Sequence, residues 1–243
     1  MESNRRYMPQ IRVPEIGKEG QELLQRKRIL IIGCGALGSV TAMYLAGAGV
    51  RTLIIADFDT VDESNLHRQV FFGEEEAGRP KVELLKERIE KLNSNVKVEI
   101  EKRLVTRKVL EEMAEEIDLI VDAADNPDTT FMIDRFCREN EISWTTAGVR
   151  GWEAQIFSYR PGSIPYSEII SQEDLEGEVM PCSVEGILGP VAGMAACIQC
   201  AEVIKLLLRV GQPLVDRLLT INLLDDTFLR LELGDEDEAG NGH

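Results

Sequence analysis

The sequence predicts an α/β fold, with a Rossmann-like, mostly parallel sheet, helices on both faces and closing antiparallel strands near the C-terminus. Three observations predict it. Short apolar runs alternate with segments of helical period, a glycine-rich turn follows the first run, and two strand-like runs end the chain with a short turn between them. Repeated strand–helix units favour a parallel sheet, because each crossover helix returns the chain to the same edge.

The first part of the chain supplies the parallel strands and their helices. Pro80 suits the first turn of a helix whose charges lie on its outer face. Residues 96–101 alternate apolar and charged side chains, as a half-buried strand does. Strands are expected at 28–32, 52–56, 96–101, 119–122 and 143–146, and helices at 37–48, 80–93, 106–116 and 127–140.

The pattern changes in the later part of the chain. Residues 155–159 suit a strand, whereas 161–182 lack clear periodicity, and so long an irregular stretch is uncommon unless it is functional or mobile. A helix at 188–209 is nearly uncharged in its first half, which favours the core or a subunit interface. Strands at 217–222 and 227–232 form the closing pair.

No linker or internal repeat divides the chain, so residues 1–233 are expected to form one domain. Residues 234–243 are acidic and Gly-rich, which predicts a disordered tail. The uncharged run 29–50 is long enough to raise the question of a membrane span. Its five glycines favour a buried strand, a turn and a core helix instead.

Charge and cysteine content narrow the class of protein further. Lys and Arg total 27 against 43 Asp and Glu, a net charge of −16, which argues against nucleic-acid and membrane binding. The polar N-terminus has no apolar signal-peptide core. Five cysteines, an odd number, favour reduced thiols and a cytoplasmic location.

A nucleotide site is predicted where Gly33, Gly35 and Gly38 form a GxGxxG turn between a strand and a helix. The first glycine permits the turn, the second lets backbone amides approach phosphate, and the third allows close packing of helix and sheet. Asp57 ends the next strand, where a carboxylate accepts bonds from ribose hydroxyls. The turn alone does not separate ATP from an adenine dinucleotide, and a turn needed only for packing is the alternative.

Polar residues beside this turn favour ATP. Arg68, Arg79 and Lys81 form a small cationic cluster in an acidic chain, and a triphosphate needs more neutralisation than backbone amides provide. Asp122, Asp125 and Asn126 stand at the carboxyl end of a strand, where a carboxylate can hold Mg²⁺. Helix caps and surface ion pairs are the alternative interpretation for each of these residues.

These motifs resemble those of the ThiF/MoeB/HesA adenylyltransferases, bacterial relatives of ubiquitin-activating enzymes. The most specific part is Ser-Asn-Leu-His-Arg-Gln at 64–69, in register with the glycine turn and with the later Asp125–Asn126 pair. The similarity covers residues 5–230. Matching segments are 6–7, 10–11, 33–38, 48–50, 57–59, 64–69, 78–81, 125–126, and Cys182 with 186–190.

The resemblance implies a homodimer that binds ATP with Mg²⁺ and the C-terminal Gly-Gly tail of a small ubiquitin-like sulfur carrier protein. The carrier carboxylate attacks the α-phosphorus, which gives an acyl-adenylate and pyrophosphate. Such chemistry needs positioning and charge stabilisation more than a covalent nucleophile. Thiamine, molybdopterin, tungstopterin, cysteine and thionucleotide pathways all stay open.

The resemblance also assigns roles to individual residues. Asp57 binds ribose, Asn65, Arg68 and Lys81 contact phosphates, and Asp125 coordinates Mg²⁺ with Asn126 beside it. Cys182 is a candidate for sulfur transfer or a transient thioester, and an inert surface thiol is its alternative. The candidate catalytic residues are Arg68, Lys81, Asp125 and Cys182; the candidate nucleotide-binding residues are Gly33, Gly35, Ala36, Gly38, Asp57, Ser64, Asn65, Leu66, His67, Arg68, Lys81, Asp125 and Asn126.

The chain departs from the family pattern in two places. Many members bind zinc through two Cys-x-x-Cys pairs, but residues 165–168 and the tail lack cysteine here. Cys197 and Cys200 lie in an apolar helix and are expected to be buried core residues, so we predict no zinc. Pro9 replaces an arginine that many relatives direct to the neighbouring subunit's ATP; Arg6 and Arg12 are possible substitutes.

Two other functions stay open. A nicotinamide-dependent oxidoreductase would use the same fold, but the sequence offers no evident catalytic histidine. His67 lies in the segment 64–69, which the resemblance assigns to phosphate binding (the phosphate segment), and His243 lies in the tail. A degenerate family member that binds a ubiquitin-like partner without catalysis is the second alternative. Pro9 and the missing zinc ligands motivate it.

Overall fold

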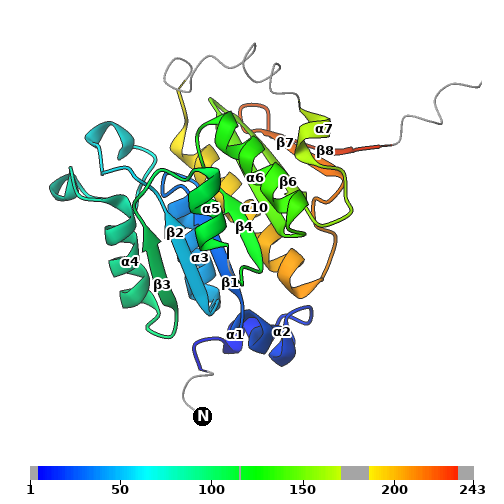
Figure 1. Ribbon diagram of the computed structural model, residues 1–243, viewed down its shortest axis with the longest axis horizontal. Helices are drawn as coiled ribbons and strands as arrows, with labels where there is room; N and C mark the ends of the chain where they lie inside the picture. The colour runs from blue at the N-terminus through cyan, green and yellow to red at the C-terminus, as the bar shows by residue number, and fades with distance from the viewer. Residues whose placement is uncertain (1–4, 115, 171–185, 235–243) are drawn as a thin grey trace, which may run out of the picture.

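The computed structural model describes residues 5–114, 116–170 and 186–234, in which one eight-stranded sheet runs through the protein (Figure 1). The strand order is β3-β2-β1-β4-β5-β6-β7-β8. The first five strands in this order are parallel to one another. Each of the last three is joined to the strand before it by an antiparallel pairing. The strands are β1 Arg28–Ile32, β2 Thr52–Ala56, β3 Lys97–Glu101, β4 Leu119–Asp122, β5 Ser143–Arg150, β6 Glu153–Tyr159, β7 Arg217–Asn222 and β8 Thr227–Glu232.

Helices cover both faces of the sheet, as the predicted fold class requires, and that prediction is confirmed. Side chains of β1 alternate between two cores: Ile29 and Ile31 pack with α3, α4 and α10, whereas Leu30 packs with α5 and α6. Figure 1 shows α5 and α6 in front of the sheet. The helices are α1 Met8–Ile11, α2 Gly17–Leu24, α3 Gly38–Ala48, α4 Lys81–Leu92, α5 Arg107–Met113, α6 Pro127–Glu139, α7 Tyr166–Ile169 and α10 Gly189–Leu208, with 3₁₀ turns η2 Glu63–Asn65 and η3 Glu74–Glu76.

The helix α10 lies in the middle of one core. By length and composition it is apolar enough to cross a membrane, but half of its apolar window is buried inside the protein. It packs against β5, β6 and α3, and its Gln199 side chain is fully buried. Its apolar character therefore has a packing explanation within the fold.

The predicted elements differ from the observed ones mainly at their ends. The expected helix at 106–116 ends at Met113, and the expected strand at 143–146 continues to Arg150 as it pairs with β6. The closing strands at 217–222 and 227–232 have the expected bounds. Tertiary pairing extends β5 beyond its apolar run, which a local pattern does not reveal.

The helices α1 and α2 were not predicted, and long-range contacts hold them. Tyr7 is buried, and its hydroxyl accepts a 2.8 Å hydrogen bond from Asn93 Nδ2. Gly49 has a φ of +87°, and a Cβ there would lie 2.7 Å from the Tyr7 ring. The N-terminal segment is thus fastened to the ends of α3 and α4.

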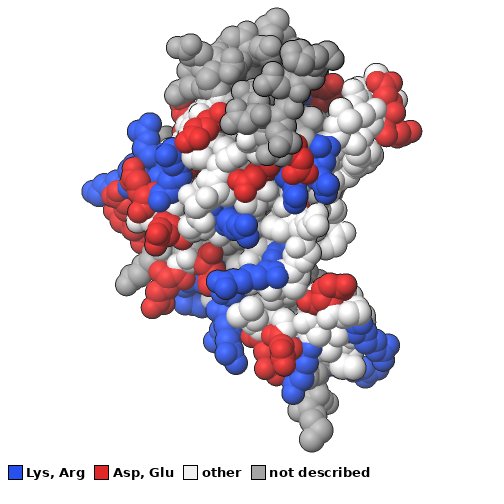
Figure 2. Space-filling view, turned by 90° about the vertical axis from the view of Figure 1, so that its right-hand side faces the viewer, with Lys and Arg blue, Asp and Glu red and all other residues white. Residues whose placement is uncertain are grey.

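Charges of both signs mix on the surface despite the net charge of −16. Figure 2 shows blue and red side chains interspersed on one face, with a paler, uncharged area between them. Many surface charges of the described residues form ion pairs, such as Arg107 with Glu111 and Glu139. The acidic excess is therefore not gathered into one large field on this face.

Candidate functional site

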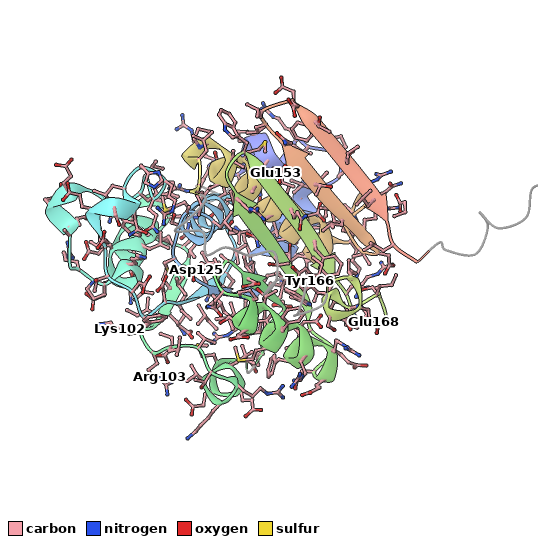
Figure 3. All side chains as sticks on the ribbon, turned by 90° about the horizontal axis from the view of Figure 1, so that it is seen from above. Lys102, Arg103, Asp125, Glu153, Tyr166 and Glu168 are labelled. Atoms are coloured by element: carbon pink, nitrogen blue, oxygen red, sulfur yellow. The ribbon has the colours of Figure 1, made fainter. Side chains whose placement is uncertain are left out.

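The carboxyl ends of β1, β2 and β4 meet at one edge of the sheet, and the predicted site residues follow these strands. In open α/β sheets, ligands bind at this edge. Figure 3 looks onto it from above and shows Asp125 near the middle of the view. The sheet therefore brings together loops that are far apart in the sequence.

The glycine turn after β1 has a distinct steric reason for each glycine. Gly33 has a φ of +97°, and a Cβ there would lie 2.4 Å from the Ala123 carbonyl oxygen. A Cβ on Gly38 would lie 1.9 Å from the Gly33 carbonyl oxygen, so the helix can approach the strand only with glycine here. At Gly35 a Cβ would meet only Gln69 Nε2, at 3.5 Å. The middle glycine thus lies beside open space.

Backbone amides at this turn are available to an anion. Within the described residues, the N–H groups of Gly35, Ala36 and Leu37 donate to no other group. They precede α3, and the first amides of a helix lack partners within the helix and carry partial positive charge. The turn therefore suits a phosphate group.

Asp57 ties the turn to the end of β2. Its Oδ2 accepts a 2.6 Å hydrogen bond from the Cys34 amide, and its Oδ1 accepts one of 2.8 Å from the Asp59 amide. Burial raises the pKa of Asp57, and these two hydrogen bonds act in the opposite direction. The carboxylate is thus held in place beside the turn.

The segment 64–69 is a compact turn whose polar side chains contact one another. Asp62 caps η2 by accepting from the Ser64 amide at 2.8 Å. Asn65 Oδ1 accepts from Arg68 Nη2 at 3.0 Å and from Gln69 Nε2 at 3.1 Å. These bonds fix the orientation of the Asn65 amide and draw the Arg68 guanidinium beside it.

The neighbouring residues of this segment point in different directions. Leu66 packs against the small core of Val61, Phe72 and Leu84. His67 is exposed, and its Nε2 lies 2.8 Å from Arg68 Nη1. Leu66 thus anchors the segment, and His67 contacts the Arg68 side chain.

The predicted cationic cluster is only partly assembled. Lys81 is 3% exposed, and its Nζ lies 2.9 Å from Asp59 Oδ2, beside the glycine turn. Arg79 instead pairs with Glu87 on α4, at 2.8 Å. Lys81, the first residue of α4, is therefore held by Asp59, whereas Arg79 is held by an ion pair along α4.

The three polar residues after β4 have three different environments. Asp122 is buried, and its carboxylate accepts from Thr130 Oγ1 at 2.7 Å and Thr146 Oγ1 at 2.9 Å; burial raises its pKa to about 6. Asn126 caps α6 by accepting from the Thr129 amide at 2.9 Å. Asp125, between them, is exposed. Asp125 is thus the carboxylate of this group that faces solvent.

The fit to Mg²⁺ rests on one carboxylate. Magnesium is commonly held by one or two protein carboxylates together with substrate phosphates and water. Asp125, exposed at the edge that carries the free amides of the glycine turn, suits such a site. In the ranges 5–114, 116–170 and 186–234, no three His, Cys, Asp or Glu side chains converge as metal ligands, and the expected absence of zinc stays a prediction.

The cysteines differ from expectation at one position. Cys200 is buried, which raises its pKa to about 12, but Cys197 is exposed, so the expectation that both are core residues is wrong for Cys197. The two residues are three apart on α10 and so lie about 60° apart around the helix axis, which lets Cys200 face the core while Cys197 faces solvent. Cys182 lies outside the described residues.

Two residues near the site were missing from the sequence-based candidates. Gln69 is 4% exposed, lies beside Gly35 and bonds to Asn65. Its spacing of four residues from Asn65 is the only sequence signal that points to this bond. Gly189 lies in the matching segment 186–190, but its contact with His67 and Arg68 could not be predicted, because the two segments are far apart in the chain.

Comparisons with known proteins agree with this geometry. A model of the ThiF family matches residues 7–241. The chain is 34% identical over 223 residues to a molybdopterin-synthase adenylyltransferase of Haemophilus influenzae, covering 91% of both proteins. It is also 34% identical to the SAMP-activating enzyme E1 of Haloferax volcanii, covering 92% of this chain and 83% of that protein.

Other relatives are longer, and a solved structure shares the fold. A probable molybdopterin-synthase adenylyltransferase of Gracilaria tenuistipitata is 34% identical over 94% of this chain, which spans 64% of that protein. The crystal structure of E. coli MccB with ATP superposes with a TM-score of 0.81 at 25% identity, covering 95% of this chain and 72% of that one.

Proposed function

The chain belongs to the ThiF family, and from this we propose that it is an ATP-dependent adenylyltransferase. Its substrate is the C-terminal Gly-Gly carboxylate of a small ubiquitin-like sulfur carrier protein, activated for sulfur transfer in molybdopterin, thiamine or related cofactor synthesis. The observation that carries the proposal is 34% identity over nearly the whole of an adenylyltransferase of similar length. The free amides at the glycine turn and the nearby Lys81 and Arg68 support it.

The chemistry requires the site to hold a triphosphate and admit a carboxylate. The carrier carboxylate attacks the α-phosphorus of ATP, the bond to the bridging oxygen breaks, and pyrophosphate leaves with that electron pair. Amides of the glycine turn, Asn65, Arg68 and Lys81 hold phosphate oxygens, and Asp57 holds ribose. A magnesium ion held by Asp125 would neutralise phosphate charge.

To bind a phosphate oxygen, Lys81 must give up its present ion-pair partner. Its ammonium is paired with Asp59, whose side chain is 48% exposed. Lys81 is itself buried, so its ammonium needs an anionic partner, and a phosphate oxygen can take the place of the partly solvated carboxylate. Asn126, as the cap of α6, fixes the backbone next to Asp125.

Residues 1–233 act as one adenylyltransferase domain in this proposal, supported by the continuous sheet. We also propose a homodimer in the cytoplasm. The cysteines described by the structure are all free thiols, which suits a reducing compartment. Position 9 carries proline, so any arginine that reaches a neighbouring subunit must come from another position.

ATP–pyrophosphate exchange tests the activity. Purified protein is mixed with labelled pyrophosphate, Mg·ATP and, in turn, small ubiquitin-like proteins that end in Gly-Gly. At least one should start exchange, and the same protein without its last two glycines should not. ATP binding without exchange for any carrier would instead favour the degenerate, partner-binding alternative.

A further inference from the structure

Gly189, the first residue of α10, lies directly against the backbone of the phosphate segment, residues 64–69. A Cβ on Gly189 would lie 2.7 Å from the His67 carbonyl oxygen, 3.4 Å from Arg68 Cα and 3.7 Å from Arg68 Cβ. Real Cβ atoms do not approach backbone oxygen so closely, and backbone cannot swing away as a side-chain tip can. Any larger residue at 189 must therefore displace His67 and Arg68, or α10 itself.

The helix α10 is the less movable of the two partners. Its Gln199 side chain is fully buried and donates to the carbonyl oxygens of Asp122, at 2.7 Å, and Thr145, at 3.3 Å. The hydroxyl of Thr41, on α3, donates to the Ala196 carbonyl at 3.3 Å. The helix is thus bonded to β4, β5 and α3 near its middle.

The chain just before α10 is held as well. The Gly151 amide donates to the Gly186 carbonyl at 3.0 Å, and the Leu188 amide donates to the Gly151 carbonyl at 3.3 Å. These bonds tie residues 186–188 to the turn between β5 and β6. The start of α10 is therefore fixed from both sides.

The phosphate segment is anchored mainly by its own short-range bonds. The Asn65 carbonyl accepts from the Arg68 amide at 3.0 Å and the Gln69 amide at 2.9 Å, and Arg68 is bonded to Asn65 by its side chain too. These contacts preserve the shape of the segment, and Leu66 packs it against Leu84 of α4, but none of them joins it to β4. The contact at Gly189 links it to β4, because α10 is bonded to the end of β4 that leads to Asp125.

We propose that Gly189 is a positioning residue: its lack of a side chain lets α10 set the place of Arg68 relative to the glycine turn and Asp125. The inference rests on the proposed function, since it concerns the grip on ATP. It assigns a role in nucleotide binding to a residue that touches no substrate.

A matched pair of substitutions on one helix tests it. Gly189 does not have a left-handed φ, so alanine suits its backbone and favours the helix. Gly193→Ala makes the same change where nothing lies within 4 Å. Calorimetric titration with Mg·ATP should show a Kd raised about 10- to 100-fold in Gly189→Ala, because small misplacements of binding groups cost this much, and an unchanged Kd in Gly193→Ala.

A double-mutant cycle separates positioning from general destabilisation. In an Arg68→Ala background, Gly189→Ala should weaken ATP binding no further, because its effect passes through Arg68. An equal Kd in Gly189→Ala and wild type, or full additivity with Arg68→Ala, overturns the inference. Failure of the wild-type protein to bind ATP would instead contradict the proposed function.

Discussion

Arg68 is the cation of the segment 64–69, whose Gln69 lies beside Gly35 of the glycine turn. Its guanidinium is bonded to Asn65 and contacts His67, and none of these contacts supports the core. We expect Arg68→Ala to lower ATP–pyrophosphate exchange about 10²- to 10³-fold, as loss of one charge-stabilising donor does elsewhere, with little change in Tm. Arg107→Ala, which removes a cation on α5, is the control and should keep full exchange.

Asp122 gives a prediction that concerns stability and pH. Burial raises its pKa from 3.8 to about 6, so the folded state binds a proton more tightly than the unfolded state between these values. Its contribution to the free energy of unfolding is therefore largest below pH 4 and falls as pH rises to 6. The free energy of unfolding of the wild type, minus that of Asp122→Asn, should fall by roughly 1–3 kcal/mol between pH 4 and pH 6 and stay constant above pH 6.

Urea unfolding of both proteins from pH 4 to pH 7.5 measures this difference, and other carboxylates cancel in the comparison. If this difference in free energy of unfolding instead rose between pH 4 and pH 6, the hydrogen bonds from Thr130 and Thr146 would outweigh the effect of burial on the pKa of Asp122.

At the scale of elements, a buried carboxylate joins α10 to the loop before β7. Glu202 is 2% exposed; its Oε2 accepts from the Leu214 amide at 2.6 Å and from Ser158 Oγ at 3.1 Å, and Lys205 pairs with it. Glu202→Ala leaves the Leu214 amide without its acceptor and removes the shorter of the two hydrogen bonds of the Ser158 hydroxyl. We expect it to lower the free energy of unfolding by about 2–4 kcal/mol.

Glu22→Ala is the matched control for that substitution, since Glu22 is on α2, half exposed, and paired, among the residues that the structure describes, only with Lys18. Its free energy of unfolding should change by less than about 0.5 kcal/mol. Equal effects of the two substitutions in denaturant titrations would show that the buried network does not stabilise the loop at Leu214.

The elements that could be predicted from sequence are those whose signal is local. The buried runs of β1, β2 and β4 and the glycine turn appear in the structure where the pattern indicated. The helices α1 and α2 could not be predicted, because the contacts of Tyr7 with Gly49 and Asn93 join distant parts of the chain. The extension of β5 likewise depends on its pairing with β6.

The same division holds within the site. Gly33, Gly35, Gly38 and Asp57 follow from spacing, since turn and strand are adjacent in the chain. The pairing of Lys81 with Asp59 and the contact of Gly189 with His67 arise only when β2, α4 and α10 come together. Sequence therefore identified candidate groups, and folding decides which of them meet.

For the whole molecule, nucleotide preference separates an adenylyltransferase from an oxidoreductase of the same sheet. A ligand that binds only the folded state raises stability by about 2.7 kcal/mol at one hundred times its Kd. Mg·ATP should therefore raise the Tm by several degrees, and NAD or NADP at equal concentration should not. A larger shift with NAD would favour the oxidoreductase.

The central claim is that this chain joins AMP to the C-terminus of a carrier protein. Intact-mass spectrometry of small Gly-Gly-terminated ubiquitin-like proteins, incubated with the enzyme and Mg·ATP, tests it most directly. The account predicts a carrier whose mass increases by one adenylyl group, and no increase when its last two glycines are removed or when Arg68→Ala replaces the wild type. Unmodified carriers throughout, with ATP bound and intact, would contradict it.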